Sequence, residues 1–161
     1  SVSENCLIMT LTVKNTGDKP IELSEYCHNF LSIDGMALGS DYRLEMSSCP
    51  DLGYGRLKNM CGENGSLRGC GHGFTFCEMS AVASDYLIEG TDIAQDKPSC
   101  WKLSHAGARA WIEERDDFVP GRICLWAVDH IICPETSFCK TLLPGEKCNW
   151  TRTWRFEMAK P

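Results

Sequence analysis

Apolar and polar residues alternate over much of the chain, and this two-residue period predicts β-strands rather than helices. Residues 6–13 are the first predicted strand, and a turn-forming sequence over residues 15–20 closes it. A second strand is predicted over residues 21–33. Its apolar positions change parity after Leu23, so a bulge near Glu25 would be needed to keep them on one face.

A long loop and a series of short strands are predicted for the rest of the chain. Seven of the fourteen glycines fall within residues 53–73, which indicates the loop. Pro144-Gly145 has the chemistry of a type II turn and joins the last two strands. The spacing of the strands is typical of a β-sandwich. They cover residues 74–82, 86–89, 101–104, 108–114, 123–128, 131–133, 138–143 and 149–156.

Length and charge narrow the range of partners. The 161 residues suffice for one domain or part of one, and 16 basic and 22 acidic residues give a net charge of −6. That balance argues against nucleic acid or an anionic membrane surface, since both are bound chiefly by Lys and Arg. The longest apolar-leaning run, residues 6–13, is far shorter than the roughly 20 residues of a bilayer span. We expect a soluble protein, and the lack of a secretory signal favours a cytoplasmic location.

Eleven cysteines are an odd number and cannot all pair in disulfides. We interpret most of them as reduced, buried apolar residues, with a disulfide-bonded secreted protein as the alternative. The cluster of Cys61, Cys70, His72 and Cys77 has the spacing C-x8-C-x-H-x4-C, which lacks the C-x2-C knuckle of structural zinc sites. We therefore expect no metal and no other cofactor.

Two titratable side chains lie in contexts suited to acid–base chemistry. His28 falls within the predicted second strand, between Tyr26 and Phe30 on one face. A histidine there is either a hydrogen-bonded residue at a sheet surface or a general acid, because imidazole titrates near neutrality. Glu135 follows Pro134 at the end of an apolar strand. A carboxylate in that place suits a pocket, where partial burial would favour base function.

All five tryptophans lie from Trp101 onward, on predicted strands. Core packing explains most of them, but one or two over a concave sheet would suit a carbohydrate. The apolar face of a sugar stacks on such rings, while carboxylates and imidazoles bind its hydroxyls. The nucleophile elbow of serine hydrolases and the glycine-rich nucleotide-binding motifs are missing from the sequence, so those functions lose support.

Several segments match, in order and approximate spacing, the C-terminal part of a known superfamily. They are residues 11–21 leading to His28-Asn29-Phe30, Cys133-Pro134-Glu135, Leu142-Leu143-Pro144-Gly145-Glu146, and residues 150–156. On these segments the chain resembles the aldose 1-epimerase, or galactose mutarotase-like, superfamily. Residues 45–120 match it poorly.

The resemblance implies a mainly β fold, an antiparallel β-supersandwich, in a single domain over residues 1–161 that lacks its N-terminal portion. It implies that His28 is the general acid and Glu135 the general base of a sugar-ring opening that needs no cofactor. We expect Asn29, Asp92 and Trp126 to contact the sugar, with Asp92 in place of the aspartate by which the family binds sugar hydroxyls.

Three functional hypotheses follow. The leading one is a carbohydrate-active isomerase, an aldose 1-epimerase or mutarotase that interconverts sugar anomers by acid–base ring opening. The alternative is a carbohydrate-binding β-sandwich module with an incomplete catalytic site. A third is a structural domain stabilised by zinc or disulfides. The expected partner is a small-molecule sugar, with neither nucleic acid nor a membrane, and a homodimer is left open.

Overall fold

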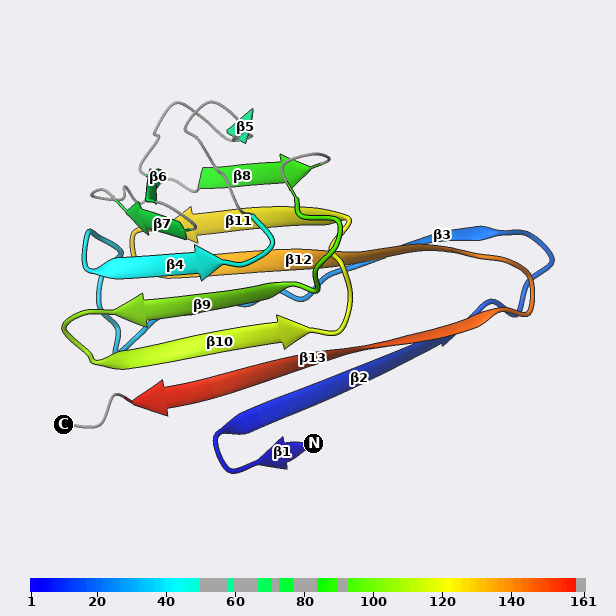
Figure 1. The fold of residues 1–161 in the computed structure, drawn as a ribbon, viewed down its shortest axis with the longest axis horizontal. Helices are drawn as coiled ribbons and strands as arrows, with labels where there is room; N and C mark the ends of the chain where they lie inside the picture. The colour runs from blue at the N-terminus through cyan, green and yellow to red at the C-terminus, as the bar shows by residue number, and fades with distance from the viewer. Residues whose placement is uncertain (50–57, 60–66, 71–72, 77–83, 90–92, 159–161) are drawn as a thin grey trace.

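A computed structural model describes residues 1–49, 58–59, 67–70, 73–76, 84–89 and 93–158 (Figure 1). The described residues form strands and loops and no helix, so the mainly β fold predicted from the two-residue period is confirmed. These described residues accordingly include no helix that could cross a membrane.

The strands form two antiparallel sheets that pack face to face, with the main hydrophobic core between them (Figure 1). The larger sheet has eight strands, in the spatial order β1 (Val2–Ser3), β2 (Cys6–Lys14), β13 (Lys147–Met158), β10 (Ala110–Asp116), β9 (Cys100–His105), β4 (Tyr42–Met46), β7 (Gly73–Phe76) and β6 (Leu67–Cys70). The smaller has five, in the order β3 (Ile21–Glu25), β12 (Ile131–Leu142), β11 (Arg122–Val128), β8 (Ser84–Glu89) and β5 (Lys58–Asn59).

Several regions differ from the sequence prediction, which includes no strand at β1 or β4. The two strands predicted over residues 131–133 and 138–143 are parts of the single strand β12. Within the predicted loop over residues 53–73, the described parts are the short strands β5 and β6 and the start of β7. The remainder of that loop lies outside the described residues.

The predicted second strand is also shorter than expected. β3 ends at Glu25, and the next backbone pairing with β12 is an isolated bridge at Leu31. Pro134 of β12 explains the gap, because it has no N–H to donate; its carbonyl accepts a hydrogen bond of 2.8 Å from the Asn29 side chain. His28 therefore lies in an extended segment after β3 rather than within a strand.

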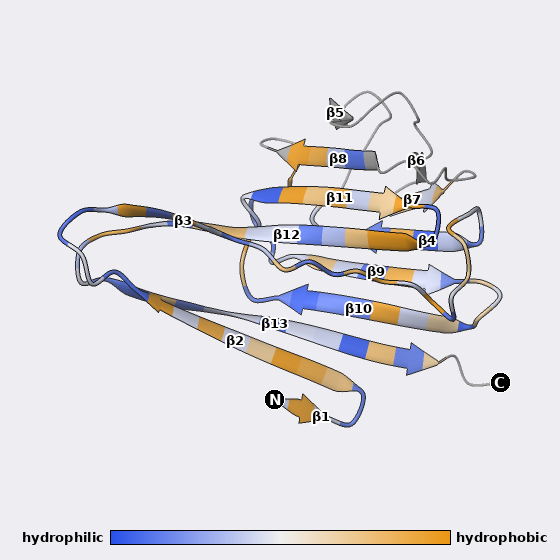
Figure 2. Cartoon of the chain, turned by 180° about the vertical axis from the view of Figure 1, so that it is seen from behind, coloured by the Kyte–Doolittle hydropathy of each residue, from blue (hydrophilic) through white to orange (hydrophobic). Residues whose placement is uncertain are grey.

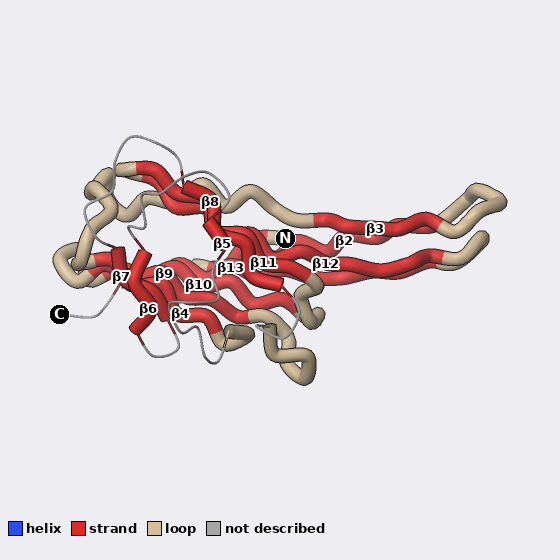
Figure 3. Tube along the Cα trace, turned by 90° about the horizontal axis from the view of Figure 1, so that it is seen from above, coloured by secondary structure: helices blue, strands red, loops and turns tan. Residues whose placement is uncertain are grey.

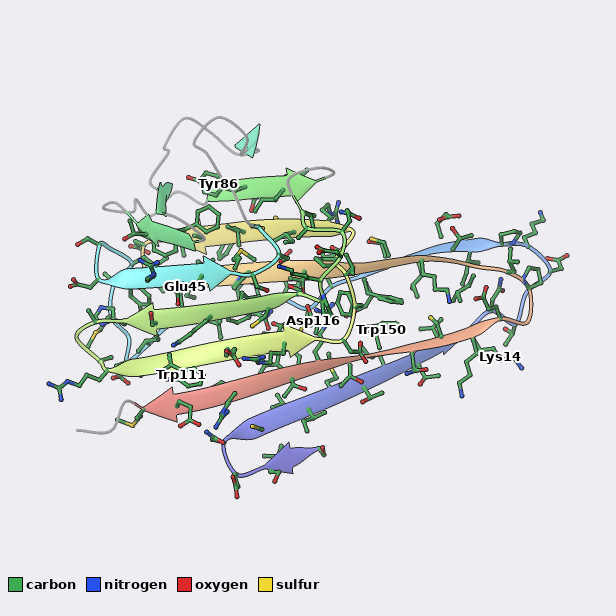
Figure 4. All side chains as sticks on the ribbon, in the orientation of Figure 1. Lys14, Glu45, Tyr86, Trp111, Asp116 and Trp150 are labelled. Carbon is green, nitrogen blue, oxygen red and sulfur yellow. The ribbon has the colours of Figure 1, made fainter. Side chains whose placement is uncertain are left out.

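β2 and β13 of the larger sheet and β3 and β12 of the smaller sheet continue beyond the sandwich as a projecting arm (Figure 3). At its tip, Asn15 donates from Nδ2 to the carbonyl of Leu142 at 2.9 Å, and its own carbonyl accepts from the Gly145 N–H at 2.9 Å. Gly145 has φ of 79°, which confirms the predicted type II turn. A second, smaller core fills the arm. Trp150 lies at the base of the arm and Lys14 near the tip of the arm (Figure 4).

Along most of β13, buried side chains alternate with exposed or half-buried ones, as the sequence pattern predicts. The hydropathy colouring of Figure 2 shows that the strand carries hydrophilic residues at several positions. One inward position holds Arg152, which is 0% exposed. Its guanidinium contacts Glu25 at 2.9 Å, Glu114 at 3.1 Å and Asp116 at 3.2 Å. It also donates to the hydroxyl and the carbonyl of Thr136. Because Glu114 and Asp116 lie on β10 and Thr136 on β12, one cation ties the two sheets together.

Three carboxylates around one guanidinium leave an excess of negative charge in the interior. Burial, and next the charge of Asp116, raise the pKa of Glu114 to about 8, against the opposing effect of Arg152. Burial also raises the pKa of Asp116. Desolvation opposes the charge on Arg152, but Asp116, Glu25 and Glu114 outweigh it and raise its pKa. At neutral pH, Arg152 is charged and Glu114 holds a proton.

Replacement of Arg152 by Ala should lower the free energy of unfolding by about 3–5 kcal/mol, because the surrounding carboxyl groups lose their cation. Urea denaturation measures the change. Arg155→Ala is the matched control, since that side chain is exposed on the same strand and its ion pair contributes less than about 1 kcal/mol. Equal losses in the two variants would contradict the role assigned to Arg152.

The Glu114 carboxyl should make stability depend on pH. Its pKa is higher in the folded chain than its ordinary value of 4.5, so its contribution is complete below pH 4.5 and is lost as the pH rises to about 8. The free energy of unfolding of the wild type should therefore fall over this interval relative to that of Glu114→Gln. Urea denaturation at a series of pH values tests this, and a constant difference between the two proteins would disprove it.

Candidate active site

Two rows of side chains cross the face of the five-stranded sheet that points away from the other sheet. Cross-strand pairing places Cys124 of β11 opposite Glu135 of β12. In the neighbouring row, Trp126 of β11 lies opposite Cys133 of β12 and next to Asp85 of β8. The intervening residues of β11 belong to the core between the sheets. The pleat therefore presents these five side chains together on the outer face.

The extended segment after β3 adds two more residues to these rows. Continuing the antiparallel register from the bridge at Leu31 places His28 beside Glu135 and Phe30 beside Cys133. The sequence prediction that Tyr26, His28 and Phe30 share one face agrees with this arrangement. The His28 ring lies 5.1 Å from that of Tyr26 and stacks on that of Phe30 at 5.3 Å.

His28 and Glu135 form the central polar contact of the site. The distance between His28 Nδ1 and Glu135 Oε1 is 2.8 Å, and the side chains are 54% and 10% exposed. The Cys133 thiol donates to the same Oε1 at 3.2 Å. Burial, and next the hydrogen bond to Glu135, raise the pKa of that thiol above its ordinary value. Glu135 is thus held between His28 and Cys133, whereas the imidazole of His28 reaches solvent.

An open pocket of about 290 Å³ begins at this pair. Its walls include the rings of Phe30 and Trp126, which meet edge to face at 5.6 Å. Asp85 and Cys124 complete the lining. The pocket thus combines a carboxylate and an imidazole in contact, aromatic surface, and a second carboxyl group across the pocket.

Two larger hollows, of about 450 and 420 Å³, have less suitable chemistry. The first is lined mainly by charged and polar residues of the eight-stranded sheet and has neither a histidine nor an aromatic ring. The second includes His105, whose Nδ1 accepts hydrogen bonds from the backbone N–H groups of Gly107 and Ala108. That nitrogen is occupied in holding a turn, so we place the site at His28.

Asn29 lies on the opposite side of the segment from His28 and is 7% exposed. Its Nδ2 donates to Glu114 Oε2 at 2.7 Å and to the Pro134 carbonyl, and its Oδ1 accepts from Trp154 Nε1 at 3.0 Å. It faces the interior and does not line the pocket, which corrects the expectation that it contacts sugar. It is a positioning residue that fixes the His28 segment against both sheets.

The other predicted residues fall into two groups. Trp126 lines the pocket with His28 and Glu135, as a sugar contact should. Asp92 lies outside the described residues, as do Cys61, His72 and Cys77 of the cysteine cluster, and the Cys70 side chain is not described either. Sequence reasoning missed Asp85, Cys124 and Phe30. The only signal for Asp85 is its pairing with Trp126 across β8 and β11, which requires the strand order.

Solved structures share this architecture. The chain aligns over 97% of its length with a galactose mutarotase related enzyme from Lactobacillus acidophilus, at a TM-score of 0.64 and 14% identity. It aligns over 97% with an aldose epimerase homologue from C. elegans, at 0.61 and 14%. A galactose mutarotase-like protein from Clostridium acetobutylicum aligns over 94%, at 0.55 and 13%. No protein-family profile and no curated protein sequence matches the chain.

The chain has the galactose mutarotase-like fold. The predicted antiparallel β-supersandwich is therefore confirmed. The chain spans 59%, 57% and 52% of the length of these three neighbours, which is little more than half of each. At these identities the galactose mutarotase-like architecture is what the comparison establishes.

Asn29→Ala should lower the free energy of unfolding by roughly 1–3 kcal/mol, because it leaves the buried Glu114 oxygen and the Trp154 N–H without a partner. Thermal or urea denaturation measures the loss. Asn149→Ala removes an exposed asparagine of β13 and should change stability by less than about 0.5 kcal/mol. A loss no larger than this control would show that Asn29 does not anchor the His28 segment.

Proposed function

We propose that this chain is an aldose 1-epimerase-like isomerase that interconverts the anomers of a small-molecule sugar in the cytoplasm. The observation that carries the proposal is the 2.8 Å contact between His28 Nδ1 and Glu135 Oε1 beside an aromatic-walled pocket. An acid and a base next to each other suit the opening of a cyclic hemiacetal. The names of the structural neighbours, a galactose mutarotase related enzyme and an aldose epimerase homologue, support the same reaction class.

The two reacting oxygens of the sugar lie close together, because the anomeric hydroxyl and the ring oxygen are bonded to one carbon. Two adjacent side chains such as His28 and Glu135 can therefore reach both. Glu135 takes the proton from the anomeric hydroxyl while protonated His28 gives one to the ring oxygen. The carbonyl forms as the bond between the anomeric carbon and the ring oxygen breaks.

Closure of the ring restores both side chains. After rotation about the bond to the carbonyl carbon, the free hydroxyl attacks the opposite face of the carbonyl and returns its proton to His28. The carbonyl oxygen takes the proton from Glu135. The cycle needs no cofactor, because His28 and Glu135 together accept and return both protons. Positioned acid and base groups of this kind contribute about 10²–10⁴-fold each.

The pocket walls provide the surfaces that would hold the sugar. Trp126 and Phe30 offer ring faces and edges for the apolar face of an aldose. Asp85 lies next to Trp126 across the strands and is placed to accept hydrogen bonds from sugar hydroxyls. We assign to Asp85 the hydroxyl-binding role that the sequence had suggested for Asp92.

A carbohydrate-binding role without turnover is the second candidate. The chain spans little more than half of its structural neighbours, whereas the pocket with its two aromatic rings lies within the described residues. In that case sugar binding would depend on Trp126 and would survive the loss of the Glu135 carboxylate.

Exchange NMR on α- and β-aldoses tests the isomerase directly. The wild type should accelerate anomer exchange, and His28→Ala and Glu135→Gln should each lower the rate by about 10²–10⁴-fold. His130→Ala is the matched control, because this exposed histidine lies five residues along the chain from Glu135, about 17 Å on an extended strand, and pairs with Asp129.

The outcomes separate the two functions. No acceleration, combined with sugar binding that Trp126→Ala removes, would replace the isomerase by the binding module. Neither acceleration nor binding with any common aldose would disprove a carbohydrate function.

A further inference from the structure

Three different metal-ligating groups meet where the His28 segment crosses β12. Cys133 Sγ lies 3.2 Å from Glu135 Oε1 and 3.9 Å from His28 Nδ1, and 2.8 Å separates Oε1 from Nδ1. Within the part of the chain that the structure describes, this is the group of three such side chains whose donor atoms all lie within 4.8 Å of one another. Local sequence patterns do not reveal this group, because His28 lies 105 positions before Cys133.

The triangle has the dimensions of one face of a tetrahedral metal site. Zinc bonds of about 2.0–2.3 Å at tetrahedral angles place their donor atoms roughly 3.3–3.6 Å apart. The three observed separations lie on both sides of that range. Shifts of about half an ångström, within the reach of side-chain torsions, would therefore bring the donors to equal distance from one ion.

The chemistry of the donors also fits. Sulfur, imidazole nitrogen and carboxylate oxygen are the three side-chain ligands that Zn²⁺ accepts, and three protein ligands leave a fourth position open. Neighbouring contacts already orient the donors: Phe30 stacks on the imidazole of His28, and Asn29 fixes the segment through Pro134. Such outer contacts typically hold metal-ligating side chains in place.

We propose that His28, Cys133 and Glu135 bind a Zn²⁺ ion, with the fourth coordination position open to the pocket. The Cys133 thiol, which donates to Glu135 in the structure, loses its proton to solvent as the bond between zinc and sulfur forms. Its three ligands are other residues than those of the cluster of Cys61, Cys70, His72 and Cys77.

The ion would act as an inhibitor of ring opening. Through Nδ1 it would hold the His28 imidazole in its neutral form, and through Oε1 it would neutralise the Glu135 carboxylate, so the pair could no longer act as acid and base. This consequence rests on the proposed function, whereas zinc binding itself does not. A zinc-dependent loss of anomer exchange, restored by a chelator, would link the two.

Competition between the full chain and a chromophoric chelator for Zn²⁺ tests the site, with thiols kept reduced by a phosphine. We expect one ion per chain whose affinity falls at least about tenfold in His28→Ala and in Cys133→Ser. With Cd²⁺, the ultraviolet charge-transfer band of a metal thiolate should be lost in Cys133→Ser. It should persist in Cys139→Ser, which removes an exposed thiol farther along β12.

His28→Ala keeps the test decisive if Cys133→Ser fails to fold, because the His28 side chain is 54% exposed. Zinc affinity unchanged by His28→Ala would overturn the proposal, and so would no detectable zinc binding. Binding lost in His72→Ala but not in His28→Ala would place the ion at the cysteine cluster and also overturn it. Zinc binding that depends on His28, in a chain that does not accelerate anomer exchange, would support the zinc site and contradict only the proposed isomerase function.

Discussion

The buried guanidinium of Arg152 is the interaction on which the rest of the structure depends. It joins β13 to β10 and β12 and reaches the end of β3, so it fixes where the two sheets meet. Two of its partners, Glu114 and Thr136, have a neighbour at the site. Glu114 also accepts from Asn29, next to His28, and Thr136 directly follows Glu135. The core network thereby sets the separation of the proposed acid and base.

The break between β3 and the bridge at Leu31 lies at Pro134. This residue has no N–H to donate to the neighbouring segment, and its carbonyl accepts a hydrogen bond from the Asn29 side chain rather than from a backbone N–H. The segment is held by a side chain on its inner face, which leaves His28 free on its outer face. The missing backbone pairing at Pro134 thus leaves the imidazole of His28 exposed beside the buried carboxylate of Glu135.

Most of the longer strands and the pair of candidate residues could be predicted from the sequence, because alternation and motif order can be read along the chain. Parity alone placed His28 on the same side as Tyr26 and Phe30. The inward position of Asn29 was missed because residues 28–30 were matched to a motif as a block, although alternation directs Asn29 the other way. Asp85 and Cys124 could not be found as site residues, because strand order and register bring them to the pocket.

A crystal structure of the chain with a bound aldose is the sharpest test of the role proposed for His28 and Glu135. We expect the sugar to lie against Trp126, with its anomeric oxygen within hydrogen-bond distance of Glu135 and its ring oxygen within that of His28. Arg152 would keep its contacts with Glu25, Glu114 and Asp116. A sugar bound in a hollow of the eight-stranded sheet, away from His28 and Glu135, would contradict the account.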